Sequence, residues 1–265
     1  MAPDGPPSAT GRAVSCTDLV KVFDASGDPV QAVGPLDATF AAGHTTALVG
    51  PSGCGKSSLL RMIAGLERPS AGTIRIGAET PRDLTRRAAL AMAFQDAALL
   101  PWRSVRSNVA LGLSLARQPP DAARIERLIG LVGLAGFNDR RPAELSGGMR
   151  QRAAIARCLV SAPELLLLDE PFGAVDELTR RRLNRDLPAL WQGTTAILVT
   201  HSVVEAAMLA DRVLVLSPRP ATIMAEIDIP LPRPRDEDDA ALRDRIAAIA
   251  AALRDSGPDR VLAAQ

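Results

Sequence analysis

Short apolar runs alternate with longer segments of helical periodicity along most of the chain. Short apolar runs between turn signals are typical of buried strands, and apolar positions three or four apart are typical of helices. The predicted strands span residues 14–23, 30–40, 45–49, 73–76, 90–94, 164–168, 195–199, 213–216 and 222–229. The predicted helices span residues 58–65, 105–116, 122–132, 147–159, 177–191, 202–210 and 236–253. Strands that alternate with helices predict an α/β core with a parallel sheet.

One block departs from this alternation. Residues 96–160 contain helical patterns only, so we expect an all-helical insertion in the α/β core. The Pro-rich start of the chain has no periodicity, and Pro230–Pro234 form a rigid break before a charged, alanine-rich segment. The predicted division is a disordered leader at 1–13, a main domain at 14–235 with its core in 14–95 and 161–235, and a helical tail at 236–265.

A glycine-rich loop joins the predicted strand 45–49 to the helix that follows it. Its sequence has the G-x-x-x-x-G-K-S spacing of a P-loop. Backbone N–H groups of such a loop can surround a phosphate chain, and the following helix adds its positive N-terminal end. We expect Lys56 to reach the β- and γ-phosphates and the Ser57 hydroxyl to hold Mg²⁺. The residues expected to bind the nucleotide are Gly50, Pro51, Ser52, Gly53, Cys54, Gly55, Lys56, Ser57 and Ser58. An ordinary glycine-rich turn is the alternative, but the strand and helix on either side argue against it.

Two carboxylates, Asp169 and Glu170, directly follow the apolar run 164–168. In open α/β sheets, ligands bind beyond the carboxyl ends of the strands, where the P-loop also lies. We therefore expect Asp169 to hold Mg²⁺ and Glu170 to polarise an attacking water. A solvated acidic turn is the alternative, and the P-loop in the same chain makes it the weaker one.

A second anion site is predicted at the start of the helix 147–159. Ser146 precedes Gly147 and Gly148, so a serine hydroxyl and bare backbone amides stand at a helix N-terminus. This segment lies far along the chain from the P-loop, within the helical insertion. A two-fold dimer would bring the second anion site of each chain over the P-loop of the other. An ordinary N-capped helix is the alternative.

Composition and charge argue against several classes of function. The formal net charge is +1, so no global field points to nucleic acid or a membrane surface. No apolar stretch approaches the roughly 18 residues of a membrane span, and the first ten residues lack the apolar core of a signal peptide. The three cysteines are odd in number and far apart, which favours a reducing compartment over a disulfide framework or a zinc site. Backbone amides and Lys56 favour a thiolate at Cys54, so we expect this thiol to react with a bulky maleimide.

Several motifs in order resemble those of the nucleotide-binding subunit of an ATP-binding cassette (ABC) transporter, over about residues 14–230. The matching segments are Gly50–Ser57 (Walker A), Gln95 (Q-loop), Leu145–Gln151 (signature LSGGxRQ), Leu165–Glu170 (Walker B), Ala174–Asp176 (D-loop) and His201 (switch histidine). The resemblance implies a RecA-like P-loop NTPase core, an N-terminal antiparallel β subdomain and an all-helical signature subdomain.

The resemblance also implies roles for single residues. Glu170, His201 and Gln95 would be catalytic, with Gln95 at Mg²⁺ and the attacking water and His201 at the γ-phosphate. Phe23 would stack on adenine, where the family usually has Tyr. The signature residues Leu145, Ser146, Gly147, Gly148 and Gln151 would bind the ATP of the opposite subunit. Asp176 would be the D-loop aspartate, and the expected Mg²⁺ ligands are Ser57, Gln95 and Asp169.

The implied cofactors are ATP and Mg²⁺, and the implied partners are those of an importer. They are a second ATP-binding subunit, expected to be a copy of this chain, transmembrane permease subunits and, indirectly, an extracytoplasmic solute-binding protein. No nucleic acid partner is expected, and the subunit would be peripheral to the cytoplasmic face of the inner membrane. Phe94–Arg103 is similar to the nitrate, sulfonate and taurine importer group. Its apolar residues with Trp102 predict a docking surface for the permease, and packing of these residues inside the helical insertion is the alternative.

Two other classes of function remain as alternatives. One is a non-transport ABC ATPase acting in DNA repair or translation, but such proteins usually carry coiled-coil insertions, zinc modules or two cassettes in one chain. The other is a P-loop switch or kinase that only binds nucleotide, and the Asp169–Glu170 pair together with the signature argues against it.

Overall fold

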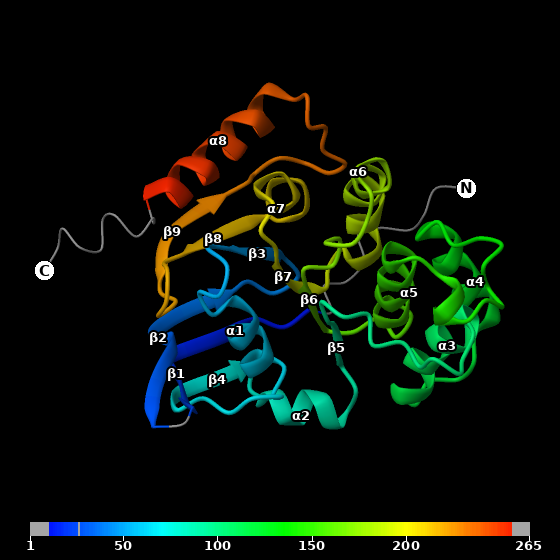
Figure 1. The fold of residues 1–265 in the computed structure, drawn as a ribbon, viewed down its shortest axis with the longest axis horizontal. Coiled ribbons are helices and arrows are strands. Elements are labelled where there is room, and N and C mark those ends of the chain that lie inside the picture. Colours follow the sequence, from blue (N-terminus) through cyan, green and yellow to red (C-terminus); the bar gives the residue numbers. More distant parts are fainter. Residues whose placement is uncertain (1–10, 26, 256–265) are drawn as a thin grey trace, which may run out of the picture.

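The computed structural model describes residues 11–25 and 27–255, and within them the strands form two sheets (Figure 1). The first is an antiparallel sheet of order β2–β1–β4, built from β1 (Val14–Ala25), β2 (Asp28–Phe40) and β4 (Ala71–Ile76). The second has the order β5–β6–β7–β3–β8–β9. Its strands are β3 (Thr45–Val49), β5 (Leu90–Ala93), β6 (Leu165–Asp169), β7 (Thr195–Val199), β8 (Arg212–Leu216) and β9 (Ile223–Asp228).

The central strands of the larger sheet are buried on both faces. In β6, Leu166 and Leu168 pack into the hydrophobic cluster that includes the helical block, whereas Leu165 and Leu167 pack into the cluster around α1 and the antiparallel sheet. A strand covered on both sides needs an uninterrupted apolar run, which explains why these segments stand out in the sequence.

The prediction of a parallel sheet is wrong at one edge. The pairs β3–β7, β3–β8, β5–β6 and β6–β7 are parallel, but β9 pairs with β8 in the antiparallel sense. Only a short turn connects these two strands, and a parallel pair would need a longer crossover. β9 is accordingly half-buried in an alternating pattern, as expected for an edge strand.

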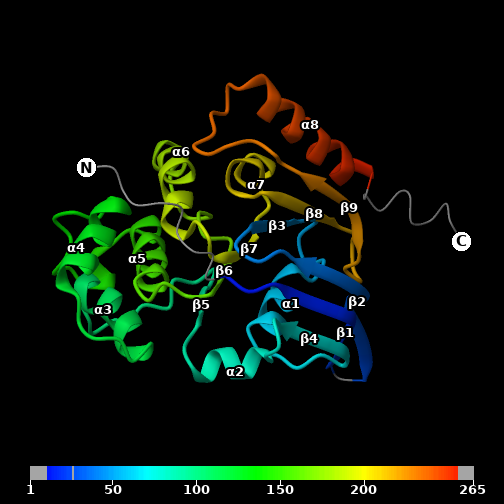
Figure 2. The ribbon, with the colours of Figure 1, turned by 180° about the vertical axis from the view of Figure 1, so that it is seen from behind.

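One helix, α1 (Lys56–Ile63), lies between the two sheets in both views (Figures 1 and 2). Its residues Leu59, Leu60 and Met62 are fully buried in the cluster shared with both sheets. The P-loop at its start is therefore held between the two sheets.

All regular structure between Asp96 and Val160 is helical, as predicted. It comprises α3 (Val105–Leu115), α4 (Ala122–Leu131), the 3₁₀ turn η1 (Pro142–Glu144) and α5 (Gly147–Leu159). This block lies to one side of the larger sheet, next to β5 and β6 (Figure 1). Ser104, Asp121 and Ser146 each accept a hydrogen bond from the backbone N–H three residues on, so side-chain caps fix the three helix starts.

Three local features differ from the predictions. The helix predicted at 177–191 divides into α6 (Glu177–Asp186) and the 3₁₀ turn η2 (Leu187–Trp191), because Pro188 cannot continue an α-helix. The short helix α2 (Pro81–Arg86) was not predicted, although Thr80 and Asp83 form its capping box. Residues 1–10 of the predicted leader lie outside the described residues. Arg12 forms ion pairs with Glu79 and Glu164, so the predicted leader is too long at this end.

The C-terminal segment covers one side of the larger sheet. α8 (Ala240–Asp255) packs on α7 (Val203–Leu209), β8 and β9, with Leu242 and Ile249 buried (Figure 1). Before it, Arg235 is buried and donates to backbone carbonyls at the end of α7, including those of Ala207 and Ala210. The tail is thus attached to the core as far as Asp255, and residues 256–265 lie outside the described residues. No helix among the described residues has the length and hydropathy of a transmembrane span.

Candidate nucleotide-binding site

The P-loop connects the carboxyl end of β3 to the first turn of α1. Gly55 stands at the N-cap of α1 with φ 123°, and a Cβ there would lie 2.4 Å from the carbonyl oxygen of Ala32. Only glycine fits this position. Lys56 Nζ donates to the carbonyls of Gly50 and Pro51, each at 2.8 Å, so its ammonium lies across the loop. The loop and the helix start together form an anion site.

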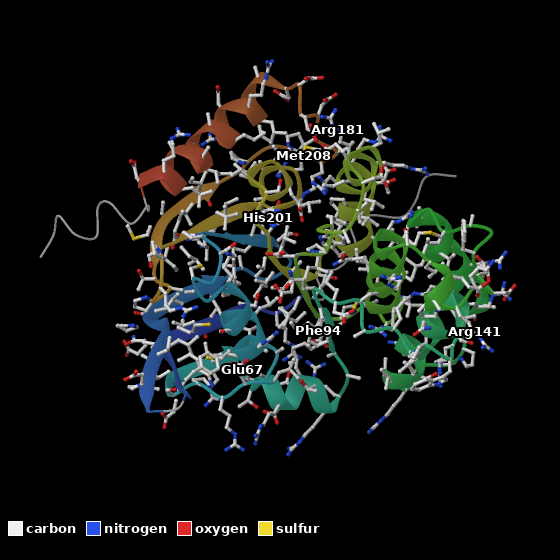
Figure 3. All side chains as sticks on the ribbon, viewed as in Figure 1. Glu67, Phe94, Arg141, Arg181, His201 and Met208 are labelled. Atoms are coloured by element: carbon white, nitrogen blue, oxygen red, sulfur yellow. The ribbon has the colours of Figure 1, made fainter. Side chains whose placement is uncertain are left out.

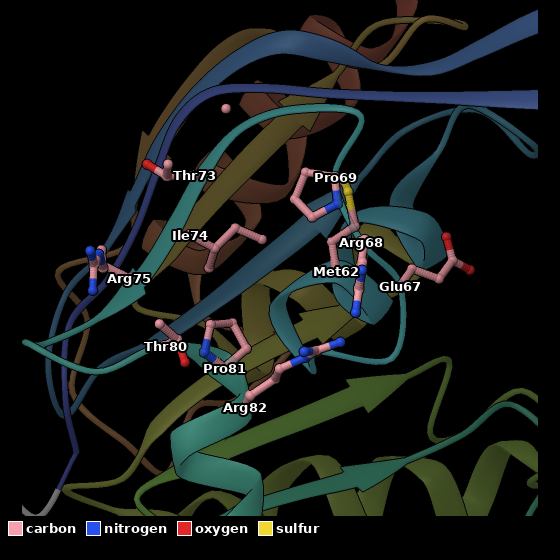
Figure 4. A pocket seen from close by; sticks show the side chains of 12 residues that line it. Met62, Glu67, Arg68, Pro69, Thr73, Ile74, Arg75, Thr80, Pro81 and Arg82 are labelled. Carbon is pink, nitrogen blue, oxygen red and sulfur yellow. The ribbon is translucent and has the colours of Figure 1, made fainter.

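A cavity of about 460 Å³ opens at this loop. It is lined by residues of the antiparallel sheet, of the P-loop and the start of α1, and of loops that follow strands of the larger sheet: Phe23, Val30, Ala32, Ser52, Gly53, Gly55, Lys56, Ser57, Ser58, Gln95, Glu170 and Arg219. A second cavity, of about 310 Å³, lies at the other end of α1, between β4 and α2 (Figure 4). None of the predicted motif residues lines that second cavity, so the cavity at the P-loop is the candidate site.

Two of the predicted Mg²⁺ ligands lie in contact. Ser57 Oγ donates a hydrogen bond to Asp169 Oδ1 at 3.0 Å, although the two residues are far apart in the sequence. Asp169 is 2% exposed, and burial raises the pKa of its carboxyl while the hydrogen bond from Ser57 lowers it. A hydroxyl and a carboxylate side by side fit Mg²⁺, which binds oxygen ligands and uses few protein groups besides substrate phosphates.

The three predicted catalytic residues also lie together. Gln95 Nε2 donates to Glu170 Oε2 at 3.2 Å, and His201 Nδ1 lies 3.7 Å from Glu170 Oε1. His201 follows β7, just before α7 (Figure 3). Glu170 itself has φ 47°, a left-handed conformation that is uncommon for any residue other than glycine. Its backbone N–H is fixed by the carbonyl of Val199 at 2.9 Å, which helps to hold the carboxylate at the cavity wall.

Phe23 lies at the edge of the same cavity, as predicted for a residue that contacts the base. Its side chain is 37% exposed, and Lys21 Nζ lies 4.7 Å from the ring centroid. Val30 and Ala32, which the sequence reading missed, add an apolar surface beside it. They come from β2, and no sequence signal marked that strand as part of the site.

The signature segment lies apart from the cavity of its own chain. Ser146 is exposed, caps α5 by accepting from the N–H of Met149 at 3.2 Å, and does not line the cavity. Gly148 packs closely, since a Cβ there would lie 2.8 Å from the carbonyl oxygen of Ala174. A single chain therefore presents two anion sites that do not share one cavity.

Two signature side chains are directed into their own chain. Leu145 and Gln151 are both 5% exposed. Gln151 Nε2 donates to the carbonyl of Glu170 at 2.9 Å and to that of Gln95 at 3.4 Å. The signature helix is thus bonded directly to the backbone of the two residues that flank the cavity.

The D-loop residue Asp176 forms the N-cap of α6. Its carboxylate accepts from the N–H of Thr179 at 2.9 Å, and hydrogen bonds with Thr179 lower the pKa of this exposed carboxyl. Negative charge at a helix N-terminus is stabilising, which accounts for the choice of Asp as a cap.

Two further residues at the P-loop differ from what the sequence predicted for the site. Arg219 lies in the turn after β8 and donates to the carbonyl of Gly53 from Nη2 at 2.8 Å and from Nε at 3.1 Å. No sequence motif identifies this arginine as part of the site. Cys54 is only 1% exposed, with its Sγ 3.8 Å from Lys56 Nζ. Its side chain packs in the cluster around α1, so burial argues against the predicted reaction of this thiol with a bulky maleimide in the folded chain.

The motif geometry agrees with the comparison to protein families. Residues 33–173, more than half of the chain, match the family model described as ABC transporter. The chain belongs to the ABC transporter family. It is an ATP-binding protein of that family, and the predicted ATPase class is confirmed.

The cassette has close curated relatives. It is 49% identical over 210 residues to the aliphatic sulfonates import ATP-binding protein SsuB of Rhodopseudomonas palustris, covering 78% of this chain and 73% of that protein. It is 42% identical over 211 residues to the taurine import ATP-binding protein TauB of Roseobacter denitrificans, covering 77% of each.

A solved structure confirms the predicted fold class. The dimeric post-hydrolysis state of the ATP-binding cassette MJ0796 bound to ADP and Pi superimposes with a TM-score of 0.75 at 26% identity. The match covers 82% of this chain and 98% of that one. The α/β core with its antiparallel β subdomain is therefore that of an ABC ATPase.

Proposed function

We propose that this cassette hydrolyses ATP to drive an importer of small solutes of the nitrate, sulfonate and taurine type. The observation that supports hydrolysis best is the contact of Ser57 with Asp169 beside the group formed by Gln95, Glu170 and His201. The printed functions of the relatives, import of aliphatic sulfonates and of taurine, support the solute class.

Each group at the cavity has a definite part in the proposed reaction. The P-loop amides and Lys56 bind the phosphates, and Phe23 offers a ring face to the base. Ser57 and Asp169 would hold Mg²⁺ together with Gln95, and the bound ion would neutralise charge that develops on the phosphates. Glu170 accepts a hydrogen bond from the attacking water and orients it, while His201 donates toward the γ-phosphate.

The active assembly is proposed to be a two-fold dimer. Ser146, Gly147 and Gly148 form an anion site that is not part of the cavity of their own chain. In a two-fold dimer this site closes over the P-loop of the partner subunit, so each ATP contacts both chains. The dimeric form of the similar cassette MJ0796 supports this arrangement.

The permease is proposed to dock at the loop before α3. Trp102 is 68% exposed, although a tryptophan is costly to leave in water. The loop that carries it is rigid, because Asn108 is fully buried and bonds the backbone of Leu100 and Arg103. An exposed tryptophan on a fixed loop suits an interface with a helix of the membrane subunit, at the cytoplasmic face of the inner membrane.

The proposal is tested with the whole transporter in proteoliposomes. The chain is co-expressed with its permease, and ATP hydrolysis and solute uptake are measured with binding protein loaded with taurine, an aliphatic sulfonate or nitrate. We expect hydrolysis that depends on Mg²⁺ and uptake of at least one of these solutes. Hydrolysis without uptake of any of the three solutes would refute the proposed solute class. Stimulation by DNA or ribosomes instead would favour the non-transport alternative.

A further inference from the structure

The turn between β8 and β9 reaches the nucleotide cavity from outside the P-loop. Because β8 pairs with β3 in the parallel sense, the chain that leaves β8 passes beside the loop that leaves β3. Arg219 in this turn lines the cavity and donates to the carbonyl oxygen of Gly53 from both Nη2 and Nε. Hydrogen bonds from a charged donor are stronger than those between neutral groups. Two donors of one planar guanidinium thus hold a single peptide group of the P-loop.

The turn that carries Arg219 is itself closed by hydrogen bonds. Ser217 Oγ accepts from the N–H of Thr222 at 2.9 Å and donates to the carbonyl of Pro220 at 2.8 Å. The N–H of Ser217 donates to the carbonyl of Thr222 at 2.9 Å. Pro218 and Pro220 restrict the backbone on either side of the arginine, because their rings fix φ. The guanidinium is therefore attached to a short, closed turn with little backbone freedom.

The same turn is attached to the apolar wall of the cavity that β2 forms. The N–H of Ala221 donates to the carbonyl of Ala32 at 3.0 Å, and the N–H of Gly34 donates to the carbonyl of Ala221 at 2.9 Å. A Cβ at Gly55 would lie 2.4 Å from the carbonyl oxygen of Ala32 and 3.2 Å from the Cβ of Ala221. Strand β2, the turn and the P-loop therefore meet in close contact, and a displacement of one of them affects the other two.

Arg219 and Lys56 hold different carbonyls of the P-loop. Lys56 Nζ bonds the carbonyls of Gly50 and Pro51 from within the motif, and Arg219 bonds the carbonyl of Gly53 from another strand connection. A carbonyl oxygen turned into the cavity would repel a phosphate, so an anion site requires its carbonyls to face other donors and its N–H groups to face the anion. A lysine that binds the β- and γ-phosphates has fewer donors left for carbonyls of the loop. The bonds from Arg219 do not depend on the position of Lys56.

We propose that Arg219 is a positioning residue for nucleotide binding, which keeps the P-loop in its phosphate-binding conformation. The inference rests on the proposed function and deepens it, because it names a residue outside the motifs that sets the ATP affinity of the same cavity. Without the guanidinium the peptide group after Gly53 is free to rotate, so the loop is ordered only at the cost of binding energy and affinity falls. Within the described part of the chain, the hydrogen bonds of Arg219 go to Gly53 and not to Glu170 or His201, so kcat depends little on it.

The test measures affinity and turnover separately on the purified full chain. Titration with ADP, which is not hydrolysed, gives Kd, and steady-state hydrolysis of ATP with Mg²⁺ gives KM and kcat. We expect Arg219→Ala to raise both Kd and KM roughly tenfold, the scale of a lost hydrogen bond from a charged donor, and to leave kcat within about twofold. Arg219→Lys keeps the charge without the planar fork and should recover only part of the affinity. Arg75→Ala is the matched control, since it removes an exposed arginine of β4 that lines the second cavity, and it should have wild-type constants.

Hydrogen exchange of the nucleotide-free chains distinguishes a positioning role from a direct contact with phosphate. Peptides that cover residues 50–56 should exchange faster in Arg219→Ala than in the wild type, while peptides that cover β6 exchange at the wild-type rate. A raised Kd with unchanged exchange in the P-loop would overturn the positioning role, because it would indicate that the guanidinium binds the nucleotide itself. Complete recovery of affinity by Arg219→Lys would also overturn it, because a point charge would then be sufficient.

The outcomes also separate this inference from the proposed function. Wild-type Kd and KM in Arg219→Ala, or a lowered kcat at unchanged KM, would refute the positioning role and leave the proposed function intact. A wild-type chain that binds ATP without hydrolysing it would refute the proposed function, and the Kd and exchange measurements would still decide this inference. If Arg219→Ala fails to fold, Arg219→Gln replaces it, since the amide keeps a polar side chain in the turn and lacks the charge and the fork.

Discussion

The buried carboxyl of Glu205 predicts that the stability of the cassette falls between mildly acidic and mildly alkaline pH. An exposed glutamate has a pKa of 4.5, and burial raises the pKa of the Glu205 carboxyl to about 7 in the folded chain. Between these values the folded state binds more protons than the unfolded state, so raising the pH favours unfolding. The contribution of the Glu205 carboxyl to the free energy of unfolding is fully present below its pKa in the unfolded chain. It is lost as the pH rises through its pKa in the folded chain.

The magnitude follows from the two pKa values. A difference of 7 minus 4.5 corresponds to about 3 kcal/mol at 1.36 kcal/mol per pKa unit. Most of this difference is expected between pH 5 and pH 8. Because Glu205 is almost fully buried, solvent screening changes this little. Glu205→Gln removes the titrating group and leaves the remaining ionisable groups in place, so the difference between the two proteins isolates this carboxyl.

The assay is urea unfolding of both proteins at several pH values from 5 to 8, followed by far-UV circular dichroism. The free energy of unfolding of the wild-type chain should fall relative to that of Glu205→Gln by roughly 2–3 kcal/mol over this range. Glu177→Gln serves as the exposed control and should run parallel to the wild type. Parallel curves for Glu205→Gln as well would refute the reasoning, because they would mean that the carboxyl is as easily ionised in the folded chain as in water.

Three other expectations follow from the site. Glu170→Gln should lower ATP turnover by roughly two orders of magnitude or more, while equilibrium binding of ATP persists. Normal turnover would refute the assignment of Glu170 as general base. Trp102→Ala should reduce co-purification with the permease and solute uptake, with basal hydrolysis of the free subunit within a few-fold of normal; unchanged assembly would place the docking surface elsewhere. A bulky maleimide should leave the folded chain active, because Cys54 is buried; rapid inactivation that Cys54→Ala abolishes would contradict this.

The sequence predicted the polar half of the site well, for a physical reason. Gln95 follows β5, Asp169 ends β6 and the P-loop follows β3, and these three strands run parallel in one sheet. The carboxyl ends of parallel strands meet at one edge, so motifs far apart in sequence must converge there. The hydrogen bond from Ser57 to Asp169 is the contact that this rule anticipates.

The rest of the site depends on packing that local patterns do not encode. Val30 and Ala32 belong to the other sheet and reach the cavity because α1 is held between the two sheets. Arg219 acts through the carbonyl of Gly53, and its turn looks like any other proline-containing turn. Cys54 shows the converse limit, since its place in the motif fixed its backbone but not the direction of its side chain.

The costly features of this cassette gather around its proposed catalytic carboxylate. The left-handed backbone of Glu170 costs roughly 1–3 kcal/mol, and burial of Glu205 adds a penalty whenever that carboxyl is charged. Neither feature serves the fold, because glycine would relieve the first and glutamine the second. Strain and unpaired charge that persist at a site are balanced by the rest of the structure, here by strands buried on both faces. The Glu205→Gln chain is therefore expected to be the more stable protein above pH 7.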